Sequence, residues 1–583
     1  MAVKSAKMSQ TASLRQYLPF TTWLPKYSRE DLTGDVIAGI IVAVMLVPQS
    51  MAYALLAGMP PETGLYASIL PLIIYGLLGT SRVLAVGPTA MMSLLIAAGI
   101  GSLNPASTAE YMQYALIMAL QVAIIQILMG VLRVGFLVNF LSHPVLSGFT
   151  SAAAIIIAFS QLRHVLGYNI PRADHFYQQV LYLFGHIGQT NPVTLLVGLG
   201  AIGVLLVFRY PLAARLKAWL PEAIAVPLSK LGPLVVVVAG VVIVSQFGLA
   251  EAAGVDIVGD VPEGLPGVTV PLFNLAMWQA VLPTAIALSL VGYMESISVA
   301  KALASKKRQK INPHQEFIAL GAANIGAAFT GAFPVTGGLS RTVVNDAAGA
   351  RTGMASIFTA LLIILTVMFL TPLFFYLPSA VLAAIILVAV AKLFDWHAFV
   401  HAWQYDRADG LSLLVTFAAV LIAGIEAGIL IGAGVSLVLY LYRTSKPHTA
   451  VIGRIPETEH FRNVKRHDVE THPEVLLFRV DESLYFPNAA YLEQQMLELV
   501  VDNPEVEHVV LVCSAVNYID VSALEVLERL LGQLRSSGVA FYMAEVKGPV
   551  MDRLKQVGFI DHLGEDHIFL STQHAYEKLR TAT

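Results

Sequence analysis

Cysteine is nearly absent from this sequence, because Cys513 is the only one among 583 residues. An internal disulfide framework is therefore excluded. Charged residues are also scarce, at 13% of the chain, whereas 56% of the residues are hydrophobic and the mean hydropathy is +0.69. A single soluble core does not account for so strong an apolar bias. The composition therefore predicts that most of the chain lies in a lipid bilayer.

Signals for other functions are missing as well. No metal-ligand cluster and no nucleophile–base pair stands out, so the sequence predicts neither an enzyme nor a metal site, and no cofactor. The charge pattern gives no support to nucleic acid as a partner. The first apolar run follows an amphipathic stretch, 14–31, and precedes many more runs, unlike a cleaved signal peptide.

Long apolar runs recur from Asp35 to Tyr442, each near the length of about 20 residues that crosses a hydrocarbon layer of about 30 Å. With glycine and proline as boundaries, we predict fourteen transmembrane spans. They lie near residues 35–58, 64–80, 88–102, 112–132, 138–166, 193–208, 231–249, 276–304, 313–330, 338–349, 353–371, 377–393, 408–423 and 426–442.

Basic residues predict the orientation of these spans, because lysine and arginine collect on the cytoplasmic side. They cluster before the first span, after the eighth and after the last, at Lys4, Lys7, Arg15, Lys26, Arg29, Lys306, Lys307, Arg308, Lys310, Arg443, Lys446 and Arg454. We therefore expect both termini to be cytoplasmic, in a multi-pass protein of the cell membrane, and a bacterial inner membrane fits best.

The composition changes from about residue 450 to that of a soluble α/β domain. Strands are predicted at 475–480, 509–513 and 540–544, and helices at 489–501, 522–536 and 550–556. This alternation predicts a small sheet covered by helices. The predicted organisation is a cytoplasmic segment 1–34, a transmembrane domain 35–442, a linker 443–459 and a soluble domain 460–583.

Two short spans occupy equivalent places, third in the first seven and third in the second seven. Residues 83–87 followed by Pro88 open one of them, and residues 332–338 with Pro334 open the other. Paired broken helices in two halves of a chain are typical of transporters built from inverted repeats. The alternative is that glycine and proline only kink two ordinary helices.

Free N–H groups at the starts of the two short helices, with about half a positive charge each, would face one another across a cavity that attracts anions. Arg341 lies in the first turn of the second one, and an arginine at the bilayer centre costs about 2.5 to 3.5 kcal/mol, so it needs a partner or a function. It could bind an anion, pair with Glu295 or reach the interface. Ser340 and Thr89 could donate hydrogen bonds to an anion or bond to their own helices.

Glu295 stands alone in the apolar stretch 276–300. Burial disfavours the charged form of a carboxylic acid, so Glu295 is a candidate proton carrier, and it is equally a candidate counter-charge for Arg341. In the first span, a proline before Gln49 interrupts the helix and places Gln49 and Tyr53 on one face, as a candidate cavity wall. Close packing of the last spans is predicted from Gly424, Gly428 and Gly432.

Five motifs carry a resemblance to a known family, at residues 47–54, 60–66, 79–88, 143–150 and 340–345. Through them the chain resembles the SulP family of anion permeases, relatives of prestin and pendrin, and residues 484–489 and 516–522 resemble a STAS domain. The resemblance implies an α-helical membrane protein with fourteen spans in a seven-plus-seven inverted repeat, core and gate domains that move against each other, and a homodimer.

The resemblance also implies the anion site, between the third and tenth spans. The family's site falls here on Gln49, Tyr53, Thr89, Ala90, Glu295, Gly338, Ser340 and Arg341. Many relatives have a serine where Gly338 stands, which predicts a wider cavity with one hydroxyl donor fewer. Sodium-coupled bicarbonate members place an aspartate at Glu295 and a hydroxyl residue at Val299. Because a hard cation needs several oxygen ligands, the sequence favours proton over sodium coupling.

In bacterial anti-sigma-factor antagonists of the STAS fold, a phosphorylated serine follows the aspartate that matches Asp520. Val521 stands at that position here, with Ser522 next to it, so we expect the domain to regulate or stabilise the transporter, with a cytosolic partner left open.

The leading hypothesis is proton-coupled uptake of sulfate or a similar oxyanion by alternating access. Alternatives are anion exchange, bicarbonate or a C4-dicarboxylate as substrate, and a non-transporting anion sensor. Helix dipoles and one arginine recognise negative charge without specifying its shape, so the sequence does not choose among these anions.

Overall fold

The computed structural model describes residues 18–135, 142–169, 176–306 and 309–582. The basic residues Lys4, Lys7, Arg15, Lys307 and Arg308, and the start of the predicted fifth span, lie outside the described residues. The chain divides into two compact units, Met1–Ser436 and Leu437–Thr583. The first is helical apart from two short strands, and the second is built on a sheet.

The helices of the first unit that line or border the cavity described below form two sets, each of which packs mainly within itself. The first set contains α3 (Arg29–Leu56), α4 (Pro61–Tyr66), α5 (Leu70–Leu78), α6 (Ala90–Gly101), α7 (Thr108–Val131), α15 (Leu275–Lys306), α16 (Pro313–Phe329), α17 (Leu339–Ala347) and α18 (Met354–Phe369). The second set contains α8 (His143–Leu166), α10 (Pro192–Arg209), α13 (Gly232–Phe247), α19 (Ser379–Val390) and α21 (Arg407–Ala423). The next helix, α22 (Ile425–Ser445), includes the boundary between the two units. Shorter helices connect the two sets: α2 (Phe20–Trp23), α9 (Phe176–Gly185), α11 (Pro211–Trp219), α12 (Glu222–Ser229), α14 (Leu249–Ala253), α20 (Trp396–Tyr405) and the 3-10 turns η1 (Leu24–Lys26), η3 (Ile187–Gln189) and η4 (Thr371–Phe374).

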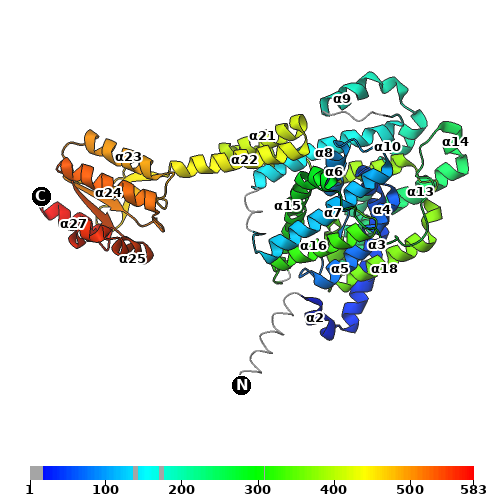
Figure 1. Ribbon diagram of the computed structural model, residues 1–583, viewed down its shortest axis with the longest axis horizontal. Helices are drawn as coiled ribbons and strands as arrows, with labels where there is room; N and C mark the ends of the chain where they lie inside the picture. The colour runs from blue at the N-terminus through cyan, green and yellow to red at the C-terminus, as the bar shows by residue number, and fades with distance from the viewer. Residues whose placement is uncertain (1–17, 136–141, 170–175, 307–308, 583) are drawn as a thin grey trace. The chain divides into compact units, whose positions relative to one another are not determined.

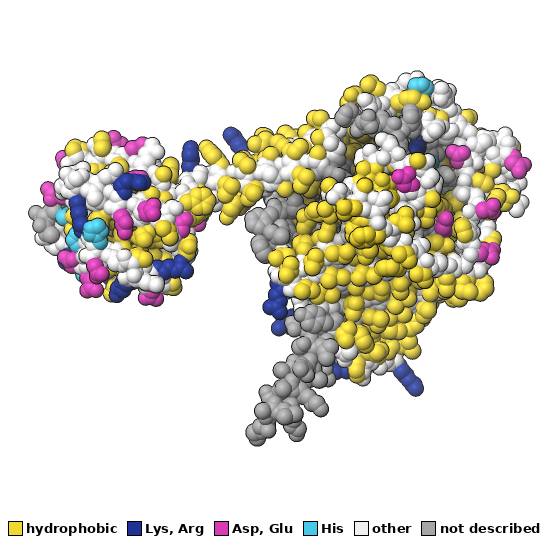
Figure 2. Space-filling view, in the orientation of Figure 1, with side chains coloured by type: hydrophobic (Ala, Val, Ile, Leu, Met, Phe, Trp, Pro, Cys, Tyr) yellow, Lys and Arg dark blue, Asp and Glu magenta, His cyan; other side chains and the backbone are white. Residues whose placement is uncertain are grey.

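Each predicted span coincides with a helix, or with the pair α4 and α5, with ends that differ by a few residues. Within the described ranges, seven helices are long and apolar enough to cross a membrane. Figure 2 shows hydrophobic side chains over much of the visible face of this unit. The helical membrane fold is therefore confirmed, and the number of crossings stays a prediction.

The two short helices are preceded by two-residue strands that pair with each other. β1 (Val86–Gly87) runs antiparallel to β2 (Thr336–Gly337), and α6 and α17 follow them directly. At about 1.5 Å per residue, neither helix is long enough to cross a layer of about 30 Å. The two broken helices thus each follow one strand of an antiparallel pair, which agrees with the inverted-repeat prediction.

Polar side chains inside the apolar helices hold this strand pair in position. The amide of Asn324 on α16 accepts a hydrogen bond from Val335 N at 2.8 Å and donates one to Val335 O at 3.1 Å. The hydroxyl of Ser296 on α15 accepts one from Gly337 N at 2.8 Å and bonds to the Thr336 hydroxyl at 2.7 Å. These hydrogen bonds satisfy buried backbone groups of Val335 and Gly337, which lie outside any helix and so have no partner of their own in a helix.

Helices α21 and α22 lie side by side (Figure 1), and small residues let them approach closely. A Cβ atom at Gly428 would overlap the Val420 side chain, and one at Gly432 would overlap the Thr416 hydroxyl. The predicted packing role is thereby confirmed for these two glycines. Gly424 instead has φ +89° just before α22, a conformation that favours glycine.

The second unit contains a six-stranded sheet in the order β4-β3-β5-β6-β7-β8. β5 to β8 are parallel, and β3 is antiparallel to both β4 and β5. Alternate residues of β5 and β6 face two cores, one beneath α23 and α24 and the other beneath α27. The elements are β3 (Thr449–Arg454), β4 (Phe461–Asn463), β5 (Val475–Val480), α23 (Ala489–Asp502), β6 (His508–Val512), α24 (Val521–Ser536), β7 (Ala540–Ala544), α25 (Gly548–Gln556), α26 (Phe559–Leu563), η5 (Glu565–His567), β8 (Ile568–Phe569) and α27 (Thr572–Ala582).

Every strand and helix predicted for this unit is present, but the linker prediction of 443–459 is too long. Residues 449–454 form β3, which stands between β4 and β5 and buries Ala450 and Ile452. Hydropathy alone does not predict β3, because this short strand lies beside a charged stretch and has no apolar run like that of β5.

We expect a fragment 447–583 to unfold cooperatively and a fragment 460–583 to be less stable by about 3 kcal/mol or more. The shorter fragment loses the buried Ile452 side chain, uncovers the edge of β5 and leaves β4 without a partner. Urea unfolding followed by circular dichroism measures the difference. Equal stability of the two fragments would show that β3 is dispensable.

Two residues of this unit that the sequence singled out have structural roles. Burial raises the pKa of the Cys513 thiol to about 12, which disfavours the reactive thiolate form. The Asp520 carboxylate caps α24 by accepting from Ala523 N at 2.8 Å, and it also accepts from Phe486 N at 2.9 Å. Val521, at the position of the phosphorylated serine, is exposed and offers no hydroxyl.

Candidate functional site

A cavity of about 270 Å³ lies between the two helix sets of the first unit. The structure places every predicted site residue on its wall. These are Gln49 and Tyr53 on α3, Thr89 and Ala90 at the start of α6, Glu295 on α15, and Gly338, Ser340 and Arg341 at the start of α17. The second set closes the other side with Leu205 and Phe208 of α10 and Ile385 and Val388 of α19. The broken helices of both halves thus begin at one cavity.

Arg341 bridges the two broken helices. Its side chain is only 3% exposed, and its Nη1 donates to the carbonyl oxygen of Pro88, just before α6, at 2.6 Å. Its Nε and Nη2 are buried and have no hydrogen-bond partner. A buried, unpaired N–H of a charged group costs free energy, so the geometry leaves room for an acceptor.

The start of α17 adds further donors. The first N–H groups of a helix have no partner inside the helix, and no side chain caps α17. At α6 the Thr89 hydroxyl accepts from Met92 N at 3.4 Å, so it caps its own helix and keeps its proton free to donate. Ser340 is exposed at the cavity. Both helix ends therefore present positive potential and donors to the same space.

Two other acidic residues are buried among the described residues of the helical bundle, both outside the stretch 276–300 in which Glu295 stands alone. Asp35 and Glu316 are fully buried. Glu316 accepts from Tyr75 OH at 2.6 Å, from Thr80 N at 2.6 Å and from Ser81 N at 3.1 Å.

Asp35 is equally well satisfied, because it accepts from the N–H groups of Arg351 at 2.7 Å and Thr352 at 3.0 Å, and from the Thr352 hydroxyl at 2.5 Å. By contrast, Oε2 of Glu295 is buried with no partner. The two satisfied carboxylates join helices, and the unsatisfied one faces the cavity.

Glu295 and Arg341 lie within electrostatic reach of each other and of Tyr53, yet no hydrogen bond or ion pair between described residues joins them. The proposed fixed ion pair is therefore absent from this structure. Each group keeps unused hydrogen-bonding capacity on the cavity side.

Sequence reasoning missed three basic residues on the cavity wall: Arg209, Lys230 and Lys392. Arg209 donates to Val388 O at 2.6 Å, and Lys392 lies close enough to the other two for their charges to repel. All three stand at or beyond the ends of apolar helices, where basic residues are common, so the pattern gave no reason to single them out.

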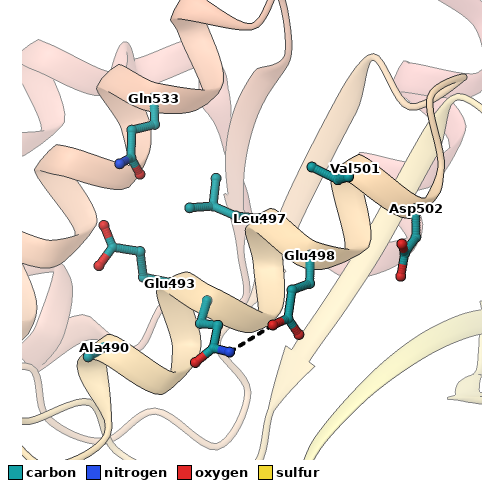
Figure 3. Close-up of a pocket in the computed structure, with 8 residues that line it drawn as sticks. Ala490, Glu493, Leu497, Glu498, Val501, Asp502 and Gln533 are labelled. Atoms are coloured by element: carbon teal, nitrogen blue, oxygen red, sulfur yellow. Dashed lines mark hydrogen bonds between the residues drawn. The ribbon is translucent and has the colours of Figure 1, made fainter.

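A groove along α23 of the second unit is larger but chemically unlike the cavity (Figure 3). Glu493, Glu498 and Asp502 line it, and Glu493 pairs with Arg529 at 2.7 Å. This acidic lining would repel an anion. Within the described parts of the chain, no group of three or more His, Cys, Asp or Glu side chains could hold a metal ion.

Comparison with known families gives two matches. Residues 32–416 match the sulfate permease family, and residues 466–575 match the STAS domain. The chain is 35% identical over 572 residues to probable sulfate transporter 4.2 of Arabidopsis thaliana, covering 96% of this chain and 83% of that one. It is 32% identical over 580 residues to a probable sulfate transporter of Mycobacterium tuberculosis, covering 98% of this chain and all of that one.

Among solved structures, the chain resembles the murine Slc26a9 anion transporter in the inward-facing state. The TM-score is 0.89 at 25% sequence identity, and the alignment covers 98% of this chain and 95% of the other. Both units of the chain therefore have counterparts in one solved protein.

Proposed function

The chain belongs to the sulfate permease family, a family of multi-pass anion transporters and not of enzymes, and we propose that it imports sulfate or a similar oxyanion together with a proton. The names of the relatives support sulfate as the substrate. The observation that carries the proposal is the buried guanidinium of Arg341, held between two broken helices with two N–H groups unpaired.

The anion would bind where the starts of α6 and α17 meet. Arg341 supplies a full charge, the two helix ends supply partial charges, and the hydroxyl groups of Thr89 and Ser340 supply neutral donors. Gln49 and Tyr53 close the cavity from α3. Every one of these groups can donate a hydrogen bond to an oxyanion.

Glu295 supports the proton as the coupling ion. An ionised carboxylate at the cavity repels an incoming anion, whereas a protonated one does not and can donate a hydrogen bond. Val299, one turn along α15, brings no oxygen ligand for sodium. Proton and anion would therefore favour each other's binding.

The position of the cavity between two helix sets supports alternating access. The first set carries the broken helices. Its movement against the second set would expose the same site to one side of the membrane and then to the other. Arg209, Lys230 and Lys392 lie at the ends of spans for which the positive-inside rule favours the cytoplasm, so we assign the side of the cavity that these three residues line to the cytoplasm. We further propose that the protein is a homodimer, that both termini are cytoplasmic and that the STAS domain has a regulatory role.

Counterflow into liposomes tests this function and its alternatives. We expect purified protein in vesicles loaded with unlabelled sulfate to accumulate labelled sulfate, and external bicarbonate, C4-dicarboxylate and chloride to compete less well. Stronger competition by bicarbonate or a dicarboxylate would identify that anion, and not sulfate, as the substrate. Binding of sulfate without any flux would favour the sensor.

A further inference from the structure

Two short helices, α11 and α20, extend from neighbouring helix ends of the second set. α11 begins two residues after the end of α10, and α20 begins shortly after the end of α19. Arg209, the last residue of α10, donates from Nη1 to the carbonyl oxygen of Val388 in the last turn of α19 at 2.6 Å. Both short helices therefore leave the second set at the same end, which the positive-inside rule assigns to the cytoplasm.

An uncovered apolar stripe runs along α20. Trp396, Val400 and Trp403 follow one another at intervals of four and three residues, so they lie on one face of the helix, and each is at least 40% exposed. The neighbouring Phe399 packs edge-to-face on Phe417 of α21, with ring centroids 5.3 Å apart. The bundle thus holds α20 by a different side chain and leaves the stripe uncovered by the described residues.

Helix α11 combines an exposed tryptophan with positive charge. Trp219 is 82% exposed, and Arg215, one turn earlier on the same face, is exposed as well. Residues 209–221 contain two arginines, one lysine and no acidic residue. Three of the five tryptophans of the chain lie on α11 and α20, so the two helices share an aromatic surface, and α11 adds a basic one.

A lipid bilayer fits this surface, because tryptophan favours the headgroup region, where its ring is apolar and its N–H group reaches water. The surface is continuous with exposed apolar side chains of the spans beside it. Leu206 and Val207 are exposed at the end of α10, just before α11, and Leu411 and Leu414 are exposed at the start of α21, just after α20. Basic residues at such a position attract the phosphate groups of anionic lipids.

We propose that α11 and α20 form a lipid-binding surface in the cytoplasmic leaflet. Trp219, Trp396 and Trp403 lie among the headgroups, and Arg215 binds the phosphate group of an anionic phospholipid. None of these four residues lines the cavity, so the surface is separate from the anion site and does not depend on which anion is transported. Because both helices extend from the second set, this contact keeps that set at a fixed depth in the membrane.

Fluorescence quenching by brominated lipids tests the headgroup preference. The full-length protein is placed in vesicles of phosphatidylcholine and phosphatidylglycerol, and the same molar amount of either lipid carries bromine on its acyl chains. We expect tryptophan quenching in wild type to be about twofold stronger when the phosphatidylglycerol is brominated, and the two lipids to quench about equally in Arg215→Gln. Arg351→Gln removes an exposed arginine at another site and should keep the wild-type preference.

Two measurements locate the rings. The variant with Trp219→Phe, Trp396→Phe and Trp403→Phe together should lose most of the quenching by either lipid, while Trp278→Phe should keep the preference for phosphatidylglycerol. Unchanged sulfate binding in detergent shows that each variant is folded, because none of these residues lines the cavity. If the triple variant does not fold, wild type and Arg215→Gln decide the question.

Three results would overturn the proposal. Equal quenching of wild type by the two lipids would remove the preference for an anionic headgroup, and an unchanged preference in Arg215→Gln would remove Arg215. Strong quenching of the three rings by aqueous iodide, with none by brominated lipid, would place them in water. Quenching by neither agent would show that protein, such as a second copy of the chain, covers them.

Discussion

Replacement of Arg341 with alanine is expected to weaken sulfate binding by at least about 100-fold and to stop uptake. Two charge-assisted hydrogen bonds are lost, each worth about 1.5 to 3 kcal/mol, together with the full charge at the starts of α6 and α17. Arg341→Glu should be worse, because it adds an anion to the site. Arg341→Lys should rescue in part, since lysine restores a point charge without the planar edge. Labelled-sulfate binding to each purified variant measures the effect.

The matched control is Arg351→Ala. Arg351 is a half-exposed arginine just before α18 that pairs with Glu30 at 3.0 Å, and it takes no part in the cavity wall. Its removal should leave sulfate affinity unchanged. Thermal unfolding of both variants shows that the fold is kept. Wild-type affinity in a folded Arg341→Ala protein would remove Arg341 from the site.

Replacement of Glu295 with glutamine is expected to abolish the response of uptake to a proton gradient and to retain sulfate binding. Glutamine resembles the neutral acid, so it does not repel the anion, but it cannot carry a proton across. Exchange of sulfate for sulfate should survive. Glu295→Ala should be worse, because the polar group beside the anion is removed as well.

Low external pH should therefore stimulate uptake by wild type and have no such effect on Glu295→Gln. Glu251→Gln, on the exposed helix α14, is the control for removal of a carboxylate and should behave like wild type. Equal stimulation of wild type and Glu295→Gln would assign Glu295 the role of a structural counter-charge.

Much of the membrane unit could be predicted from the sequence because the bilayer imposes strong rules on it. Each span must be apolar and close to a fixed length, so hydropathy located the helices to within a few residues. Glycine and proline at 83–88 and 332–338 located the broken helices, because those residues interrupt the backbone hydrogen bonds. The eight site residues then followed from the family motifs, and all line one cavity.

What could not be predicted depends on contacts between distant parts of the chain. The acceptor of Arg341 is the backbone carbonyl of Pro88, which carries no residue-specific signal. Glu316 belongs to the first turn of α16, where an acid is common, yet it joins α16 to residues 75–81 by several hydrogen bonds.

The most direct test of the account is accumulation of labelled sulfate in liposomes under an imposed proton gradient. Sodium is left out, and the membrane potential is clamped at zero. One unit of pH across the membrane supplies about 1.4 kcal/mol per proton, so the account predicts an inside concentration about tenfold above the outside for each proton carried with sulfate. Equilibration without accumulation, while counterflow in the same vesicles proceeds, would contradict proton coupling.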